Sequence, residues 1–437
     1  MRSICLALPT NRACAAAIAA VGREAAYAAR YFDVEVHLLV LDSSRELDLA
    51  GHAKAVADLP AEPNVVVHHL GEAQQRAFLR AAIERAGLAK PELMLELMLP
   101  DAVSYGACTN RAFLIAAALG CASLHRRDSD SAYQSLDGET IFPIHHELMS
   151  LGRSARDAAD GVTENELDPA AADRPVVLVG SSFIGELSVD IAEIQELDPA
   201  VYQDVVGLWA PGDWTAEQRR ELVDESFKGA GTEPFAADHS VLTIADPMRL
   251  DMCNISFDRE VYERVPLLPA TDTIGSDYFL MHLVYDAGLP GVLHNRNIVN
   301  YYTAERRTGP GFTAYQLRFA KFFLSMLYLN FIYARMGEAG GALLDAGHHV
   351  RPDAVAGLAR ESARLPWDEN ERRLDVLDRS YRRLGGKYAQ FADHLAQRRG
   401  QLLAEAQADI EDFALLVEAW EPLVRASRAT SVPRPDR

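Results

Sequence analysis

The residues of this chain best suited to chemistry are two aspartates one residue apart, Asp128 and Asp130, which follow a short apolar run. If that run ends a strand, both carboxylates emerge at the carboxyl edge of a sheet, where open α/β sheets bind ligands. Two close carboxylates repel each other, so they favour either a bound divalent cation or a raised pKa. Oxygen ligands suit Mg²⁺ or Mn²⁺, ions that commonly join a carboxylate to a substrate diphosphate. The alternative is that Asp128 and Asp130 are simply two surface acids in a polar turn, which would have the same sequence.

Apolar runs typical of strands alternate with runs at helical spacing through the first third of the chain. The expected elements are strands at 3–8, 34–42 and 65–70, and helices at 13–31, 74–87 and 105–120. Strands that alternate with helices predict a parallel sheet with helical crossovers. Gly120 is expected to stop the last of these helices, eight residues before the acid pair.

The composition excludes several classes of protein but does not indicate a particular function. The 437 residues carry a net charge of −20, which argues against nucleic-acid and anionic-membrane partners. The five cysteines form no Cys-X-X-Cys pair, so neither a zinc ribbon nor a disulfide framework is indicated. The longest apolar run, 322–333, is too short to span a bilayer, and we find no signal peptide. We therefore expect a cytoplasmic protein without a membrane span.

The pattern divides the chain into four parts. These are an α/β part at 1–151, an acidic linker at 152–174, a second part of the catalytic domain at 175–312 and a helical region at 313–437. Within the last part, we expect helices at 315–336, 371–399 and 402–426, with Gly340-Gly341 and Gly385-Gly386 as plausible breaks. The final helix has an apolar stripe that it must bury. We expect it to dock on the helix around 319–333, and a homodimer through these helices is the alternative.

The order of these features resembles that of GT-A glycosyltransferases, which use nucleotide sugars. The resemblance rests on the Pro9-Thr10 turn after the first strand, on the Asn110-Arg111 pair in a helix and on the Asp-X-Asp that follows it. It continues in three later segments, Leu250 to Tyr262, Gly275 to Leu280 and Tyr301 to Arg307. It implies an α/β fold with a GT-A-like, mainly parallel sheet flanked by helices, to which this chain adds an α-helical C-terminal region.

The resemblance also implies roles for particular residues. Those expected to bind the nucleotide sugar are Pro9, Thr10, Arg12, Asp42, Asn110, Arg111, Arg127 and Asp128. The expected metal ligands are Asp130, Asp128 and His294. Because neighbouring residues of a strand point to opposite faces, at most one of Arg126 and Arg127 should reach the phosphates.

Further roles fall in the second half of the chain. Arg306 and Arg307 lie beside glycines, as in a lid over a diphosphate. Asp277 is the expected general base, with Asp272 as the substitute if Asp277 is structural. The chain departs from the family pattern in two places. Ser276 replaces the first acid of an acidic pair, and the late loop lacks a histidine.

Most of these residues also have a structural explanation. Thr10 could cap a helix, Arg111 could pair with a core acid, Asp277 could cap a helix and His294 could be a core histidine. Arg126 and Arg127 could form an exposed basic turn, and Arg306 and Arg307 could belong to a solvated linker.

The sequence therefore predicts a metal-dependent glycosyltransferase that uses Mn²⁺ or Mg²⁺. Its partners would be a nucleoside diphosphate sugar and a small-molecule acceptor such as a natural product. The alternatives are a nucleotidyltransferase on a related sheet and a non-catalytic sugar-nucleotide binder. Against the nucleotidyltransferase, the first turn lacks a Gly-rich sequence.

Overall fold

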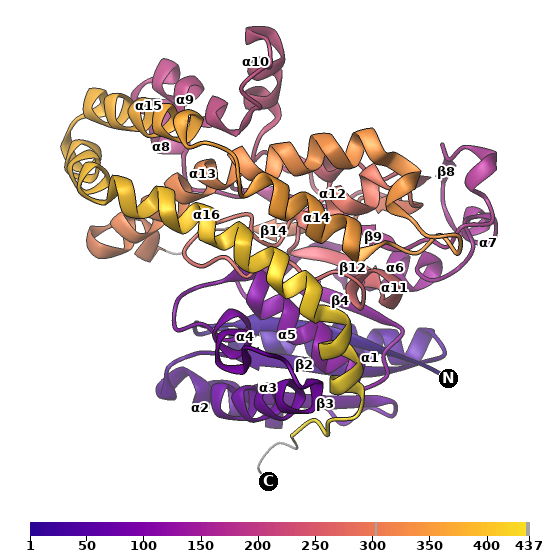
Figure 1. Ribbon diagram of the computed structural model, residues 1–437. Helices are drawn as coiled ribbons and strands as arrows, with labels where there is room; N and C mark the ends of the chain where they lie inside the picture. The colour runs from indigo at the N-terminus through magenta and orange to yellow at the C-terminus, as the bar shows by residue number, and fades with distance from the viewer. Residues whose placement is uncertain (302–303, 434–437) are drawn as a thin grey trace.

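The computed structural model describes residues 1–301 and 304–433, and it has a central, mainly parallel sheet with helices on both faces (Figure 1). The strands lie in the order β3 (Val65–Gly71), β2 (Val34–Asp42), β1 (Arg2–Thr10), β4 (Ser123–Arg127), β12 (Asn254–Asp258), β9 (Leu178–Gly180), β13 (Gly291–His294), β11 (Ser240–Thr243) and β8 (Glu164–Asn165). From β3 to β4 all pairs are parallel, whereas β12 runs antiparallel to both of its neighbours. The predicted α/β class, mainly parallel sheet and helical C-terminal region are confirmed.

The helices occupy both faces of the sheet and the C-terminal region. In chain order they are α1 (Ala15–Tyr31), α2 (Glu46–Ala57), α3 (Glu72–Ala86), α4 (Pro91–Met98), α5 (Tyr105–Ala118), α6 (Ile144–Ser150), α7 (Ala155–Ala158), α8 (Ala192–Leu197), α9 (Pro199–Val206), α10 (Ala216–Glu225), α11 (Arg259–Tyr262), α12 (Phe279–Asp286), α13 (Gly309–Ala339), α14 (Pro352–Ser362), α15 (Asp368–Leu384) and α16 (Gly386–Arg428). Short 3-10 turns include η3 (Gly207–Trp209) and η5 (Ala304–Arg307). A small sheet joins β10 (Phe183–Gly185), β14 (Ile298–Asn300) and β5 (Ser131–Tyr133), and β6 (Ser135–Leu136) pairs with β7 (Glu139–Thr140). Within the described residues, no helix is both long and apolar enough to cross a membrane.

The central strand β1 is buried on both faces, which explains why it is a nearly continuous apolar run. Ile4, Leu6 and Leu8 share one hydrophobic core with α1. Cys5 and Ala7 point to the other face and share a second core with α3, α4 and α5. Because side chains alternate along a strand, the two helical layers fix which residues of β1 and of its neighbour β4 face each way.

The segment 152–174, which we expected to be a linker, forms regular structure. It contains α7 and the strand β8, which pairs in parallel with β11 at the edge of the sheet. The backbone of Ala155 and Arg156 also hydrogen-bonds to that of Arg174 and Ala172. The segment is acidic because many of its side chains are exposed to water, although its backbone is hydrogen-bonded to neighbouring segments.

The C-terminal helices break at Gly385 and Gly386, a pair that we noted as a plausible break, and not near residue 400, where the predicted helix bounds would end one helix. α15 ends at Leu384, and Gly385 and Gly386 have φ of +74° and +50°, a conformation that glycine adopts at little cost. α16 then continues through Gly400 without a break, because one glycine within a long packed helix costs only about 1 kcal/mol.

α16 packs along the length of the same chain (Figure 1). It contacts α13 as predicted, and also α14, α15 and the sheet-covering helices α3 and α5. The Phe413 ring lies 4.8 Å from that of Phe279, and the Trp420 indole N–H donates to the Tyr262 carbonyl oxygen at 2.9 Å. The apolar stripe is therefore buried within the chain, and α16 joins the helical region to the sheet.

We predict that Trp420→Ala lowers the free energy of unfolding by about 3–5 kcal/mol, because it leaves a cavity and an unpaired carbonyl group. Trp420 is fully buried, whereas Trp214 is 38% exposed. Trp214→Ala is therefore the matched control and should change the unfolding free energy by less than about 0.5 kcal/mol. Urea unfolding measures both. If both substitutions change the free energy of unfolding by the same small amount, α16 does not hold the helical region against the sheet.

Candidate functional site

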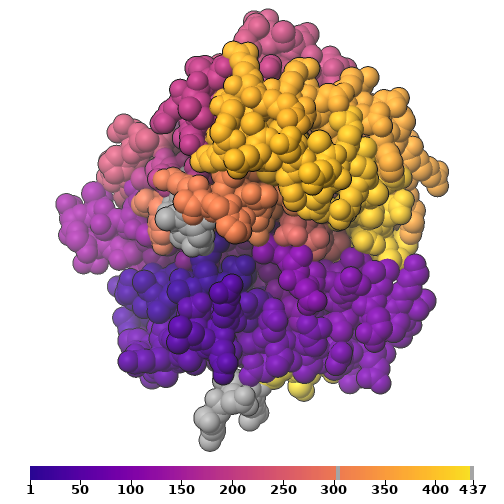
Figure 2. Space-filling model, turned by 90° about the vertical axis from the view of Figure 1, so that its left-hand side faces the viewer, coloured from indigo at the N-terminus to yellow at the C-terminus, as the bar shows by residue number. Residues whose placement is uncertain are grey.

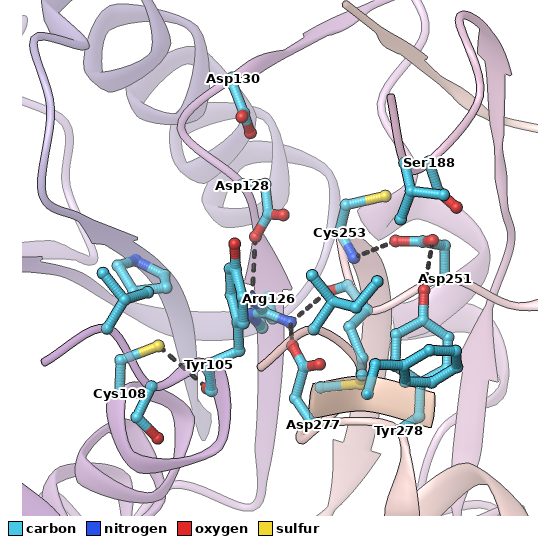
Figure 3. A pocket seen from close by; sticks show the side chains of 18 of the residues that line it. Tyr105, Cys108, Arg126, Asp128, Asp130, Ser188, Asp251, Cys253, Asp277 and Tyr278 are labelled. Atoms are coloured by element: carbon cyan, nitrogen blue, oxygen red, sulfur yellow. Dashed lines mark hydrogen bonds and ion pairs between the residues drawn. The ribbon is translucent and has the colours of Figure 1, made fainter. Parts of the chain in front are cut away.

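A cavity of about 340 Å³ lies where the carboxyl ends of β1 and β4 meet the helical region (Figure 3). Thr10, the last residue of β1, and Arg12 line it on one side, and Asp128 and Asp130, which follow β4, line it beside them. Figure 2 shows the segment after residue 303 (orange) against the indigo N-terminal region, with the yellow C-terminal helices above. The sheet thus contributes one wall of the cavity, and later segments contribute the other.

Arg126 is the central cation of the cavity. This side chain is 3% exposed, and its guanidinium donates to Asp277 at 2.7 Å and to the Met252 carbonyl at 3.1 Å. It also pairs with Asp128 at 3.0 Å. Burial alone would lower the pKa of Arg126, but Asp128 and Asp277 raise it above its usual value. Arg126 is therefore a permanent positive charge that joins β4 to the opposite wall.

The acids around Arg126 have unequal environments (Figure 3). Burial raises the pKa of Asp128 to about 6, and the nearby carboxylates of Asp130, Asp251 and Asp277 add to this shift while Arg126 opposes it. Burial also raises the pKa of Asp277, against the effect of Arg126. Asp251 accepts hydrogen bonds from the Tyr278 hydroxyl at 2.6 Å and the Cys253 backbone N–H at 2.9 Å. The cluster would gain from another positive charge near Asp128.

Asp130 lies between two arginines from distant parts of the chain. Arg12, after β1, donates to its carboxylate at 2.7 Å, and Arg306, in η5, donates to the same oxygen at 3.0 Å. Thr10 supports the first turn, because its hydroxyl donates to the Arg12 carbonyl oxygen at 3.0 Å. The turn after β1, the loop after β4 and η5 therefore meet at one carboxylate.

Four residues that we expected at the site lie elsewhere, and two of these are Arg127 and His294. Arg127 points to the opposite face of the sheet, where it pairs with Glu24 at 2.8 Å and Glu147 at 3.0 Å. We predicted that only one of the two adjacent arginines would face the site, but we chose the wrong one. Arg126, not Arg127, lines the cavity. His294 lies in β13 and stacks on His146 at 5.3 Å, so it is a core histidine and not a metal ligand of this site.

Asp42 and Asn110 are the other two, and both are structural. Burial would raise the pKa of Asp42, but hydrogen bonds from His69, Ser44 and His52 lower it to about 2. His52 also accepts the Cys14 backbone N–H at 2.9 Å, so this network holds the start of α1. The Asn110 amide pairs with the backbone of Leu267 in both directions, at 2.8 and 2.9 Å.

The remaining predicted residues lie at or beside the cavity. Pro9 and Arg111 line it, although Arg111 donates to the Gln75 side chain and the Met98 carbonyl, both at 2.7 Å. Arg307 pairs with Asp190 at 2.9 Å, outside the set of residues that line the cavity. Of the late-loop segment in the resemblance, Tyr302 and Thr303 lie outside the described residues.

Ser276, where the GT-A resemblance led us to expect an acid, contacts the backbone of α5. Its hydroxyl accepts the Gly106 backbone N–H at 3.2 Å. Gly106 itself packs tightly, because a Cβ there would lie 1.8 Å from the Leu268 carbonyl oxygen.

The sequence analysis chose Arg127 instead of Arg126, and it gave no role to Asp251 or Tyr278. Arg126 and Arg127 are equivalent in sequence, and only the helices on each face of β4 distinguish them. Asp251 and Tyr278 fall within segments of the resemblance, but the hydrogen bond between them depends on a contact 27 residues apart. Within residues 1–301 and 304–433, no three His, Cys, Asp or Glu side chains form a complete metal site.

Comparison with known proteins gives a family but no function. No curated protein matches the chain. Among solved structures, it is similar to a mannosyltransferase, PcManGT from Pyrobaculum calidifontis, solved in complex with GDP-Man and Mn²⁺. The identity is 11%, the match covers 95% of this chain and 86% of the other, and the TM-score of 0.35 is too low to bear on function. A model of a family of unknown function, DUF6271, matches residues 2–436, so the chain belongs to this family.

Proposed function

We propose that this protein transfers a sugar from a nucleoside diphosphate sugar to a small-molecule acceptor, with a divalent cation at the donor end of the cavity. The proposal is carried by one observation. Asp128 and Asp130 directly follow β4, at the carboxyl edge of the sheet, and Arg12 and Arg306 converge on Asp130. Ligands of open α/β sheets bind at this edge.

Arg12 and Arg306 are suited to a diphosphate because guanidinium groups donate paired hydrogen bonds to phosphate oxygens. Both arginines contact Asp130. We infer that a diphosphate takes this place and frees the Asp130 carboxylate. The turn at Pro9 and Thr10 would then contact the nucleoside.

Asp128 and Asp130 fit a divalent cation by their chemistry. Mg²⁺ and Mn²⁺ sites commonly use one or two carboxylates and complete their coordination with substrate phosphates and water. Burial and the neighbouring carboxylates raise the pKa of Asp128, so a cation nearby would favour its charged form. A cation held there would neutralise the charge that develops on the departing diphosphate.

Asp277 is our candidate base. It would take the proton of an acceptor hydroxyl while that oxygen forms a bond to the anomeric carbon of the sugar. The bond from that carbon to the diphosphate oxygen breaks, and its electron pair leaves with the diphosphate. A raised pKa makes Asp277 a better proton acceptor, and the 2.7 Å contact with Arg126 fixes its orientation.

Asp130→Asn tests the cation site. With Mn²⁺ present, a nucleoside diphosphate should raise the melting temperature of the wild-type chain, and the mutant should lose the Mn²⁺-dependent part of this rise. Diphosphate binding without metal should remain, because Arg12 and Arg306 are still present and lose their competing partner.

Asp137→Asn is the matched control, because Asp137 is an exposed turn residue with φ of +52° that asparagine tolerates. Full Mn²⁺-dependent stabilisation of Asp130→Asn would contradict the assignment. Formation of a nucleoside triphosphate from added pyrophosphate and the nucleotide sugar, with no release of nucleoside diphosphate, would identify a nucleotidyltransferase.

The affinity for the cation should depend on pH through Asp128. Its pKa of about 6 means that it is largely charged at pH 7 and largely protonated at pH 5. Protonation competes with the metal, so Mn²⁺ affinity should fall about tenfold from pH 7 to pH 5. Electron paramagnetic resonance of free Mn²⁺ measures this directly. Asp128→Asn should bind Mn²⁺ weakly at both values, and an unchanged pH profile in that variant would exclude Asp128 as the titrating ligand.

Asp277→Asn should reduce transfer by at least about 10²-fold and leave nucleoside diphosphate affinity within a few-fold, because the base acts on the acceptor. Nucleoside diphosphate release and isothermal titration measure the two quantities. Asp272→Asn is the control, since this acid lies five residues away, outside the cavity. If Asp251→Asn abolishes transfer and Asp277→Asn does not, Asp251 is the base.

A further inference from the structure

The cavity has a second part that the donor does not explain. It is lined by Trp209, Phe227, Phe322, Met326 and Tyr333, which we call the aromatic chamber. These residues come from η3, the loop after α10, and α13. The same cavity therefore has a charged end at the sheet and an apolar end against the helical region, and each end favours a different kind of ligand.

The chamber is built from rings that support one another. Trp209 stacks on Phe227 with 5.0 Å between ring centroids, and the Phe322 ring meets Trp209 edge-on at 5.5 Å. A further edge contact joins Phe227 to Phe319 at 6.0 Å. Such contacts limit the movement of each ring, so the flat apolar surfaces are present before a ligand binds.

Two backbone positions lie close against the rings of the chamber. Phe227 has φ of +63°, a left-handed conformation that is rare for a bulky side chain and concentrates at ligand sites. Gly275 has φ of +72°, and a Cβ there would lie 2.9 Å from the Phe322 ring. The ring therefore packs directly against the backbone beside Asp277.

Polar groups lie where the chamber meets the acids. The Tyr278 hydroxyl donates to Asp251, and Asp277 lies beside Tyr278 in the chain (Figure 3). His282 stacks on Tyr333 at 3.8 Å, and burial lowers its pKa to about 4, so it adds no charge at neutral pH. A ligand in the chamber thus meets apolar rings along its body and carboxylates at one end.

We infer that the acceptor is a hydroxyl-bearing molecule with a flat, apolar body, such as a phenol with fused rings. Its body lies in the aromatic chamber, and its hydroxyl group points toward Asp251 and Asp277. The identity as an acceptor rests on the proposed function, whereas binding to the chamber does not. A sugar acceptor is disfavoured because its many hydroxyl groups would be desolvated against rings that offer them few partners.

The test uses the full chain without donor or metal. Isothermal titration with 2-naphthol should show one site, whereas methyl glucoside, which carries hydroxyl groups on a polar body, should show no binding at the same concentrations. Ser188→Trp should weaken 2-naphthol binding at least tenfold, because Ser188 lines the cavity and its backbone N–H bonds to the Phe227 carbonyl oxygen at 3.0 Å. This change fills the cavity without removing a core side chain.

Trp209→Ala should have the same effect as Ser188→Trp, and Trp214→Ala, at an exposed position, should leave the affinity unchanged. Urea unfolding verifies that each variant folds.

Equal binding of the two probes, or full 2-naphthol affinity in folded Ser188→Trp, would overturn the inference. If 2-naphthol binds but no nucleotide sugar is cleaved, the chamber is upheld and the transferase function fails. If a sugar acceptor is glycosylated and 2-naphthol does not bind, the function stands and the chamber assignment fails.

Discussion

The pairing of the buried Arg126 guanidinium with Asp128 and Asp277 is the interaction on which the cavity depends. A buried cation is tolerated when carboxylates compensate its charge, and removal of one partner leaves a costly unpaired charge. Here the partners come from both walls, since Asp128 follows β4 and Asp277 precedes α12. The sheet and the second half of the chain are therefore joined by charge at the point where the ligand site forms.

β4 has a second buried cation on its other face. Arg127 contacts Glu24 and Glu147, and Glu147 also accepts from His125 at 2.6 Å. Adjacent arginines thus have separate acidic partners on opposite faces of the strand, and the two sets of ion pairs hold β4 from both sides.

The helical region supplies the apolar end of the cavity and its rigidity. α13 contributes Phe322, Met326 and Tyr333, and α16 packs on α13 and reaches back to the helices that cover the sheet. The cavity lies between two regions that the last helix holds together, so its shape depends on long-range packing. This explains how a preformed aromatic wall can face a charged wall from a different part of the sequence.

Much of the fold could be predicted from periodicity. The strand from Val34 to Asp42 was predicted with its observed bounds, and most early helices were placed within a few residues. These elements are buried on one or both faces, so the spacing of their apolar residues indicates whether each is a strand or a helix. The helices α2 and α4 were not predicted. The apolar residues of α2 do not follow a clear helical spacing, and only His52 of this helix is buried. The break at Gly385 and Gly386 was noted as plausible, but the predicted helix bounds did not use it.

The sequence by itself determined the order of the elements and that acids would follow β4, because both depend on residues close together in the chain. Only the tertiary structure decided that Arg126 and not Arg127 faces the cavity, since the two differ only in the partners on each face. It also decided that Asp42 is enclosed by histidines, that Asp251 meets Tyr278 and that aromatic residues from η3 and α13 meet beside them. Each of these depends on contacts between segments that are distant in sequence, and such contacts cannot be predicted from local periodicity.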